Sequence, residues 1–351
     1  MATIPISKPF IRRKDMDAVL SCLVNDEIGP GKASARLEKE VTSLLKGRYA
    51  LALREYTRAV EIAIRALELP EGATLAVPAL CHPVYALVAR SLGYRVAVVD
   101  SEADTPVVAP GALEALVAAE GTPETPGVGA VVVDTPLGLV ADLPAIISLG
   151  VPVIEDVSTG FGATLEEQLA GSFGQVTVVG LEASHILTAA GGAVVVFRDR
   201  QVAAKAKELA AGLLPESRLS DLNAALGITQ LAELQKQLTR REELAERFSQ
   251  ALGRGRHVTP AQPETASPVW PVFSVVLEGS VKDAATYARK YGVETESSFS
   301  GSYLAGHATA EEAASVIRAQ GFLLRTLSFP LYPRLGKEQV TTIERVLATL
   351  P

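Results

Sequence analysis

The sequence has 351 residues and a mass of 36.9 kDa, which is too large for one small hydrophobic core and predicts a large domain with a smaller companion. Hydrophobic residues make up 48% and charged residues 21%, without biased tracts, so we expect a globular chain. A net charge of −7 with scattered Lys and Arg, and the lack of an apolar run of roughly 18 residues, argue against nucleic acid and membranes as partners and predict a cytoplasmic protein.

The first 250 residues alternate between short apolar runs and segments of helical periodicity. After an extended arm, helices are expected over residues 15–24, 33–45, 57–67 and 84–92, and strands over 50–53, 74–77, 95–99, 130–133, 151–154, 176–181 and 192–197. Short strands that alternate with helices are typical of a parallel sheet. The last two strands are separated by a loop, which permits an antiparallel pair. Long helices are expected over residues 200–252, with a break near 212–215.

The rest of the chain has a different pattern. Residues 253–268 are rich in Gly, Pro and Thr, as in a linker. A strand is expected over 269–277, a helix over 281–291, a strand over 321–328 and a closing helix over 337–350. We therefore predict an α/β fold that consists of an N-terminal arm (1–11), a large domain with a mostly parallel central sheet (12–250) and a small α+β domain (251–351).

Three blocks of residues resemble motifs of one enzyme family. They are 153–156 (VIED) with 160–164 (GFGAT) and 171–174 (GSFG), then 218–227 (RLSDLNAALG), and finally 327–335 (LSFPLYPRL). In this order they resemble the DegT/StrS family of sugar aminotransferases, and the similarity extends from about residue 4 to residue 350. The resemblance implies the two-domain, fold-type-I architecture of pyridoxal-phosphate (PLP) enzymes.

The resemblance assigns Asp156, just after a predicted buried strand, to the pyridine nitrogen of PLP. Such an acid keeps the ring protonated and able to accept electrons, and parallel sheets bind ligands at the carboxyl ends of their strands. The alternative is that Asp156 only caps its own loop. His82 stands where the family has a ring-stacking aromatic residue, or else bonds a carbonyl at a helix start. Thr159 replaces a longer residue near the phenolic oxygen of the ring.

The family's Schiff-base lysine is replaced by His185. The segment 182–186 (EASHI) occupies the place of the lysine loop, and no lysine lies between Lys46 and Lys205. An imidazole can act as a general base but offers no amine for an internal aldimine. Ordinary transamination is therefore not expected.

The turn that holds the cofactor phosphate in the family is also altered. Its Ser-Gly-Thr sequence corresponds here to residues 54–57 (REYT), which keep only Thr57. Glu55 brings a carboxylate to an anion site at a helix N-terminus, and Tyr56 replaces the glycine that lets a phosphate approach. We expect Glu55 to cap the helix amides itself. A carboxylate of Glu55 or Glu216, or the Tyr56 ring, is predicted to fill the phosphate volume.

The residues at two further positions also weaken the expected binding of the cofactor phosphate. Gly180 stands in place of a serine that binds the phosphate, and Glu216 in place of an asparagine from the partner subunit. We therefore expect no tightly bound cofactor. Arg54 and Arg58 flank the altered turn, where they suit a different anion or else form ion pairs with neighbouring glutamates.

The leading functional hypothesis is a family homologue that has lost PLP-dependent transamination and acts as a ligand-binding or partner-binding homodimer. Its ligand is expected to be a sugar nucleotide or another small anion. The alternative is a sugar-nucleotide dehydratase or aminotransferase-type enzyme that holds PLP or pyridoxamine phosphate non-covalently and uses His185 as base, since Ser184-His185 resembles the motif of the family's dehydratases.

The dimer interface is expected on the helix after Arg218, which carries Leu222, Ala225 and Leu226. Cys22 and Cys81 lack the spacing of metal ligands, so no metal site is expected.

Overall fold

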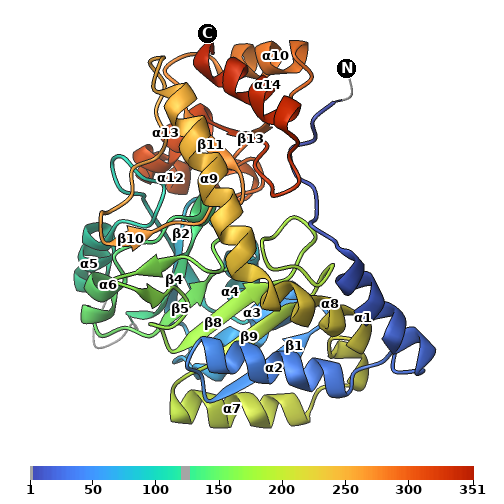
Figure 1. Cartoon of the computed structure of the whole chain (residues 1–351). Helices are drawn as coiled ribbons and strands as arrows, with labels where there is room; N and C mark the ends of the chain where they lie inside the picture. The colour runs from blue at the N-terminus through green and yellow to red at the C-terminus, as the bar shows by residue number, and fades with distance from the viewer. Residues whose placement is uncertain (1–2, 120–126) are drawn as a thin grey trace.

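The computed structural model describes residues 3–119 and 127–351, which form a large mixed sheet between two layers of helices and a smaller sheet near the C-terminus (Figure 1). The large sheet has the strand order β1-β9-β8-β5-β4-β2-β3. The neighbouring pairs from β8 to β3 are parallel, and β9 runs antiparallel to both β8 and β1. The predicted α/β fold with a mostly parallel central sheet is confirmed, and the loop-connected pair is antiparallel.

The bounds of the elements are close to those expected in the first 250 residues. The strands of the large sheet are β1 (Tyr49–Leu53), β2 (Thr74–Pro78), β3 (Arg95–Val99), β4 (Val128–Asp134), β5 (Val153–Asp156), β8 (Val176–Gly180) and β9 (Ala193–Phe197). The helices are α1 (Arg13–Val24), α2 (Lys32–Leu44), α3 (Tyr56–Ala66), α4 (Val84–Ser91), α5 (Pro110–Ala119), α6 (Leu143–Ser148), α7 (Arg200–Ala211), α8 (Asp221–Ala232) and α9 (Leu234–Leu252).

Two smaller sheets complete the fold. One contains β6 (Thr164–Leu165), β7 (Gln168–Leu169) and β10 (Ala266–Ser267); the other contains β11 (Phe273–Val276), β12 (Glu296–Ser297) and β13 (Thr326–Phe329). The remaining helices are α10 (Val281–Lys290), α11 (Tyr303–Gly306), α12 (Ala310–Ser315), α13 (Ile317–Arg325) and α14 (Lys337–Ala348). The division into an arm and two domains remains a prediction.

Apolar residues on both faces of the large sheet explain its central position. Alternate residues of β1 belong to two different hydrophobic clusters, because successive side chains of a strand point to opposite faces. Ala50 and Ala52 join the cluster that includes α2, α5, α6 and α8, whereas Leu51 and Leu53 join that of α3, α4 and α7. The sheet is therefore covered by helices on both sides.

The strand predicted over residues 321–328 is wrong in its first half. Gly321 to Arg325 belong to helix α13, and only residues 326–329 form strand β13. The apolar run at 322–324 resembles a buried strand, but Ala319 and Phe322 are buried at helical spacing while Leu324 is 71% exposed.

Within the described ranges, no helix is both long and apolar enough to cross a membrane.

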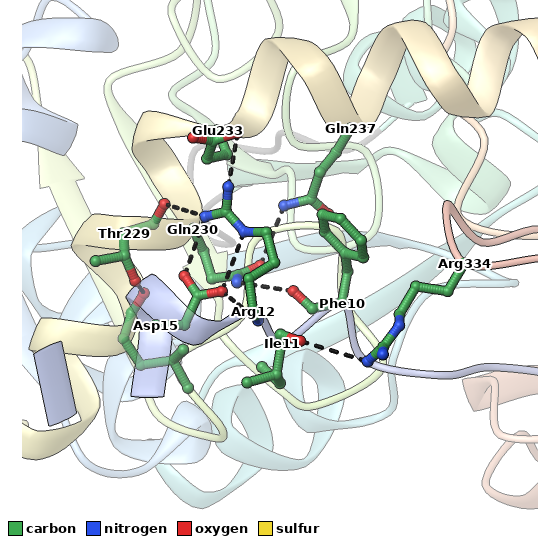
Figure 2. A network of polar contacts seen from close by, with 10 residues as sticks. Phe10, Ile11, Arg12, Asp15, Thr229, Gln230, Glu233, Gln237 and Arg334 are labelled. Carbon is green, nitrogen blue, oxygen red and sulfur yellow. Dashed lines mark hydrogen bonds and ion pairs between the residues drawn. The ribbon is translucent and has the colours of Figure 1, made fainter. Parts of the chain in front are cut away.

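The N-terminal arm is anchored to α8 and α9 by a polar network (Figure 2). The Gln230 side chain donates to the carbonyl of Phe10 at 3.0 Å, and Arg12 forms ion pairs with Glu233 at 2.6 Å and with Asp15 at 3.1 Å. Burial opposes ionisation of Asp15, but the Arg12 guanidinium outweighs it and lowers the pKa of that carboxyl. These contacts hold the start of α1 against the end of α8.

A buried arginine joins α9 to the smaller C-terminal sheet. Arg241 is 6% exposed, and its Nη1 donates to the carbonyl oxygens of Trp270, Pro271 and Leu331 at 2.8, 3.0 and 2.7 Å. Burial lowers its pKa to about 10, so the side chain stays protonated at neutral pH. In Figure 1, α9 extends from the large sheet to the side of α14, and Arg241 lies along this path.

We predict that Arg241→Leu lowers the free energy of unfolding by about 3 kcal/mol, because three carbonyl groups, one of them in a fully buried contact, lose their donor. Urea unfolding followed by circular dichroism measures this effect. Arg240→Leu is the matched control, since Arg240 is partly exposed and forms an ion pair with Glu243 at the surface. Equal stability of the two variants would contradict the role given to Arg241.

Candidate functional site

A cavity of about 780 Å³ opens at the carboxyl ends of β2, β4 and β5. It is also lined by Glu296, in the short strand β12 of the smaller sheet, and by residues 298–302, which follow that strand. All five site residues predicted from the sequence line it: Thr57, His82, Asp156, Thr159 and His185. The structure thus brings together residues that are up to 128 positions apart.

Two acids at the end of β5 have different tasks. Glu155 is 1% exposed and accepts hydrogen bonds from the backbone amides of Gly171, Phe173 and Gly174 at 2.6, 2.7 and 2.5 Å. Burial raises the pKa of Glu155, although these three amides oppose the shift. A side chain at position 174 would meet the carbonyl of Val153, so a glycine is needed there. Glu155 therefore fixes the 171–174 turn and leaves Asp156 to face the cavity.

The carboxylate of Asp156 accepts three hydrogen bonds from within the chain. Its Oδ1 accepts from the backbone amide of Ser158 at 2.8 Å, and its Oδ2 accepts from the hydroxyl groups of Tyr85, at 2.7 Å, and Tyr56. Burial, reinforced by the charge of Asp156, raises the pKa of both tyrosines well above the ordinary value. The hydroxyl groups thus remain protonated and act as donors to the acid.

The position of Tyr56 corrects the expectation for the altered turn. Glu55 is the N-cap residue of α3, but its side chain makes no capping hydrogen bond and is exposed to solvent. Tyr56 instead turns its ring toward Asp156 and lies edge-on to His82 at a centroid distance of 5.4 Å. A carboxylate in water keeps its hydration, whereas a tyrosine gains from burial of its ring. Glu216 is exposed and does not line the described part of the cavity.

His82 caps a helix rather than bonding a carbonyl. Its Nδ1 accepts a hydrogen bond from the Val84 amide at 3.2 Å, in the first turn of α4. Burial lowers the pKa of the imidazole despite the nearby charge of Asp156. A neutral ring with its proton on Nε2 fits this contact.

His185 lies on the loop between β8 and β9. Its Nδ1 is 2.9 Å from the carbonyl oxygen of Gly180 and 3.3 Å from the amide nitrogen of Glu182. The shorter contact favours a proton on Nδ1, which leaves Nε2 as an acceptor. A Cβ atom at Gly180 would lie 2.8 Å from the Ser158 hydroxyl oxygen and 3.0 Å from His185 Cε1. A larger residue at position 180 would therefore require the Ser158 or His185 side chain to shift.

The two threonines have simpler surroundings. Thr159 donates its hydroxyl hydrogen to the carbonyl of Thr135 at 2.7 Å, which ties its side chain to the backbone. Thr57 lies in the first turn of α3 and is exposed. Arg58 forms an ion pair with Glu61 at 2.5 Å. An ion pair with a neighbouring glutamate was one of the two alternatives predicted for this residue.

Sequence reasoning missed Asp134 and Tyr85. Asp134 ends β4 and is in register with Asp156 at the end of the adjacent parallel strand β5. Burial, and then the charge of Asp156, raise its pKa to about 7. The signal was an acid directly after a Val-rich strand, the same signal that identified Asp156. Tyr85 gave no comparable signal, because it lies inside a helix and reaches the site only through the packing of α4.

The sequence profile of the DegT/DnrJ/EryC1/StrS aminotransferase family matches residues 9–348. The chain belongs to this family.

Solved structures of similar fold include aminotransferases and a sugar-nucleotide dehydratase. S. venezuelae DesV, in complex with a ketimine intermediate, has a TM-score of 0.87 at 22% identity and covers 99% of this chain and 98% of its own. The aminotransferase TlmJ from Streptoalloteichus hindustanus has a TM-score of 0.86 at 23% identity, with coverage of 98% and 97%. E. coli GDP-4-keto-6-deoxy-D-mannose-3-dehydratase with bound hydrated PLP has a TM-score of 0.85 at 19% identity, with coverage of 99% and 100%.

We predict that Asp134→Asn raises the free energy of unfolding by about 2 kcal/mol at about pH 8 and has little effect at about pH 4. The folded pKa of about 7 lies above the unfolded value of 3.8, so the native state loses stability as the pH rises through this window. An asparagine cannot ionise and avoids this loss.

Urea unfolding of both proteins across this pH range provides the test. Asp104→Asn, at an exposed aspartate, serves as control. A stability difference that does not change with pH would show that Asp134 does not titrate in this window.

Proposed function

We propose that this family member has lost PLP-dependent transamination and uses its cavity to bind a small polyhydroxylated ligand. The observation that supports the proposal is that the hydroxyl groups of two tyrosines already donate hydrogen bonds to Asp156. The ring acid of a PLP enzyme must meet the pyridine nitrogen, but Oδ2 of Asp156 already accepts from Tyr56 and Tyr85. A cofactor ring could reach this oxygen only if the Tyr56 side chain moved away.

The cavity also offers no amine for a covalent cofactor. Its lining, among the described residues, contains no lysine, and His185 is the residue that the family resemblance aligns with the lysine. An imidazole forms no Schiff base, so a lasting covalent link is excluded at this position. The hydroxyl that would bind the phosphate is also missing, because position 180 holds a glycine, against which Ser158 and His185 pack closely.

The charge of the cavity lining disfavours a phosphate dianion. Its carboxylates are Glu55, Asp134, Asp156, Glu182 and Glu296, and its arginine is Arg54. Like charges around a doubly charged anion raise its free energy of binding. We therefore place a neutral or positively charged ligand in the cavity rather than the anionic one considered from the sequence. Ser298, Ser300 and Ser302 supply hydroxyl groups that match a sugar.

A second candidate is a dehydratase-type enzyme with His185 as base. It is favoured by one observation, namely that His185 and Asp156 line the same cavity. The similar fold of the E. coli dehydratase keeps this candidate open. The tyrosine contacts of Asp156 argue against it, since non-covalent PLP also needs its ring nitrogen and phosphate bound.

We predict that the purified protein is colourless, gains no absorbance band of bound PLP when PLP is added, and yields no adduct with borohydride. His185→Lys alone is expected to bind PLP weakly, at least about tenfold less than a family aminotransferase, because Tyr56 still covers Asp156. His185→Lys with Tyr56→Gly frees the acid and is expected to bind PLP more tightly. Absorbance titration and mass spectrometry after borohydride reduction measure these outcomes.

Tyr56→Phe in the His185→Lys background is the matched control, since it removes the hydroxyl group but keeps the ring in place. This variant should remain close to His185→Lys. Stable PLP binding by the unmodified protein would overturn the proposal and favour the dehydratase-type enzyme. Tight binding by His185→Lys alone would show that Tyr56 is no obstacle.

A further inference from the structure

A second, much smaller cavity also borders His185. It is lined by the N-terminal arm (residues 7–10), the His185 loop (183–186), and Gln230, Gln237 and Arg241 of α8 and α9. Its volume is about 10 Å³, which is about the space that a single water-sized species needs. A sugar or a phosphate is too large for it.

The lining of the small cavity is positively charged. It contains Lys8 and Arg241 and, within the part of the chain that the structure describes, no aspartate or glutamate. The larger cavity has the opposite character, with five carboxylates and one arginine in its lining. The two cavities therefore attract ligands of opposite charge.

Arg241 lacks a counterion among the described residues. Its Nη1 donates to the carbonyl oxygens of Trp270, Pro271 and Leu331, which carry only partial charges. Its Nε is buried and has no hydrogen-bond partner in the described part of the molecule. A buried charge is costly without a counterion, and a buried N–H group is costly without an acceptor.

Arg198 provides a comparison, because its Nε is also buried without a partner. Burial lowers the pKa of Arg198, but the charge of Glu155 opposes this effect. For Arg241, burial alone lowers the pKa, and no acid of the described chain opposes it. Arg241 is thus a buried arginine whose charge is left for a ligand to balance.

We propose that the small cavity binds one chloride-sized monovalent anion, which accepts a hydrogen bond from Nε of Arg241. Lys8 adds a second positive charge to the lining. The side-chain amides of Gln230 and Gln237 use one N–H each, toward the carbonyl of Phe10 and Oε1 of Gln230 (Figure 2). An amide group has two N–H hydrogens, so the second of each can donate to the ion.

Charge decides between an anion and a water molecule. A water molecule supplies an acceptor for Nε but leaves the charge of Arg241 unbalanced. A halide ion is only slightly larger than water and supplies both the acceptor and the negative charge. The bound ion would join the arm, the His185 loop and α9, and its binding does not depend on what the larger cavity holds. Either proposal can therefore fail without the other.

The test measures the thermal unfolding of the full-length protein in sodium chloride, with sodium gluconate added to keep the ionic strength constant. Gluconate is too large for the cavity. An ion that binds only the folded state stabilises it, so we expect the midpoint temperature to rise by about 2 °C between about 1 mM and 100 mM chloride. Sodium bromide should have the same effect as sodium chloride.

Gln237→Glu supplies a carboxylate inside the chain. Gln237 is 2% exposed and precedes Arg241 by four residues on α9, a spacing at which glutamate and arginine form an ion pair in a helix. This variant should lose the chloride-dependent rise, because the arginine already has its counterion. Gln235→Glu makes the same change at an exposed position of α9 and should keep the rise.

Removal of the positive charge gives an independent test. Arg241→Leu should also lose the chloride-dependent rise, whereas Arg240→Leu should keep it, since Arg240 pairs with Glu243. If Arg241→Leu does not fold, Gln237→Glu decides the outcome, because it keeps the arginine and nearly the same side-chain shape.

Crystals of the unmodified protein grown in sodium bromide locate the ion. We expect an anomalous difference peak in the small cavity, next to Nε of Arg241. A cavity that holds only water would overturn the proposal, as would equal stability in chloride and gluconate. A chloride effect that persists in Gln237→Glu would place the ion elsewhere and overturn it as well. A bromide peak without any effect of chloride on stability would mean an adventitious ion only.

Discussion

A buried carboxylate is costly to keep ionised unless hydrogen-bond donors surround it. Asp156 meets this condition inside the chain, with an amide on one oxygen and two tyrosine hydroxyl groups on the other. These hydrogen bonds to Asp156 hold the Tyr56 ring in place, and with it the start of α3 and the wall of the cavity. Most of the chemistry available to the site depends on this arrangement, since a ligand that needs the acid has to displace a phenol first.

The fold does not depend on that chemistry. The Val-rich and Ile-rich strands are buried on both faces, and the apolar area that they remove from water is the same whether or not the cavity holds a cofactor. Glu155 ties the 171–174 turn to β5 through three backbone amides, also without a ligand. A chain of this family therefore keeps its architecture at about 20% identity to a structural neighbour.

The sequence was informative where one periodicity or one residue type decides the outcome. Short buried strands, the strand-end acid Asp156 and the His185 loop follow from local patterns and from the resemblance. Gly321 to Arg325 were misread because an apolar run of three residues fits a strand and a helix equally well, and only packing of Phe322 decides between them. The directions of the Tyr56 and Glu55 side chains could not be predicted from the sequence. They depend on residues of α4 and β5 that are distant along the chain.

Under the proposed function, the residues of the cavity are physically linked to one another. A phosphate dianion at the N-terminus of α3 would oppose a carboxylate at position 55, a second at 182 and a third at 296, and it would need space beside position 56. Without that dianion the cost of these acids disappears, and a tyrosine at position 56 gains both a hydrogen bond and burial. Asp156, freed from a pyridine ring, then becomes an acceptor that holds the two tyrosines in place. A lysine introduced at position 185 would remove none of these obstacles, because it would bond to the aldehyde of the cofactor, whereas the obstacles lie where the ring nitrogen and the phosphate would bind.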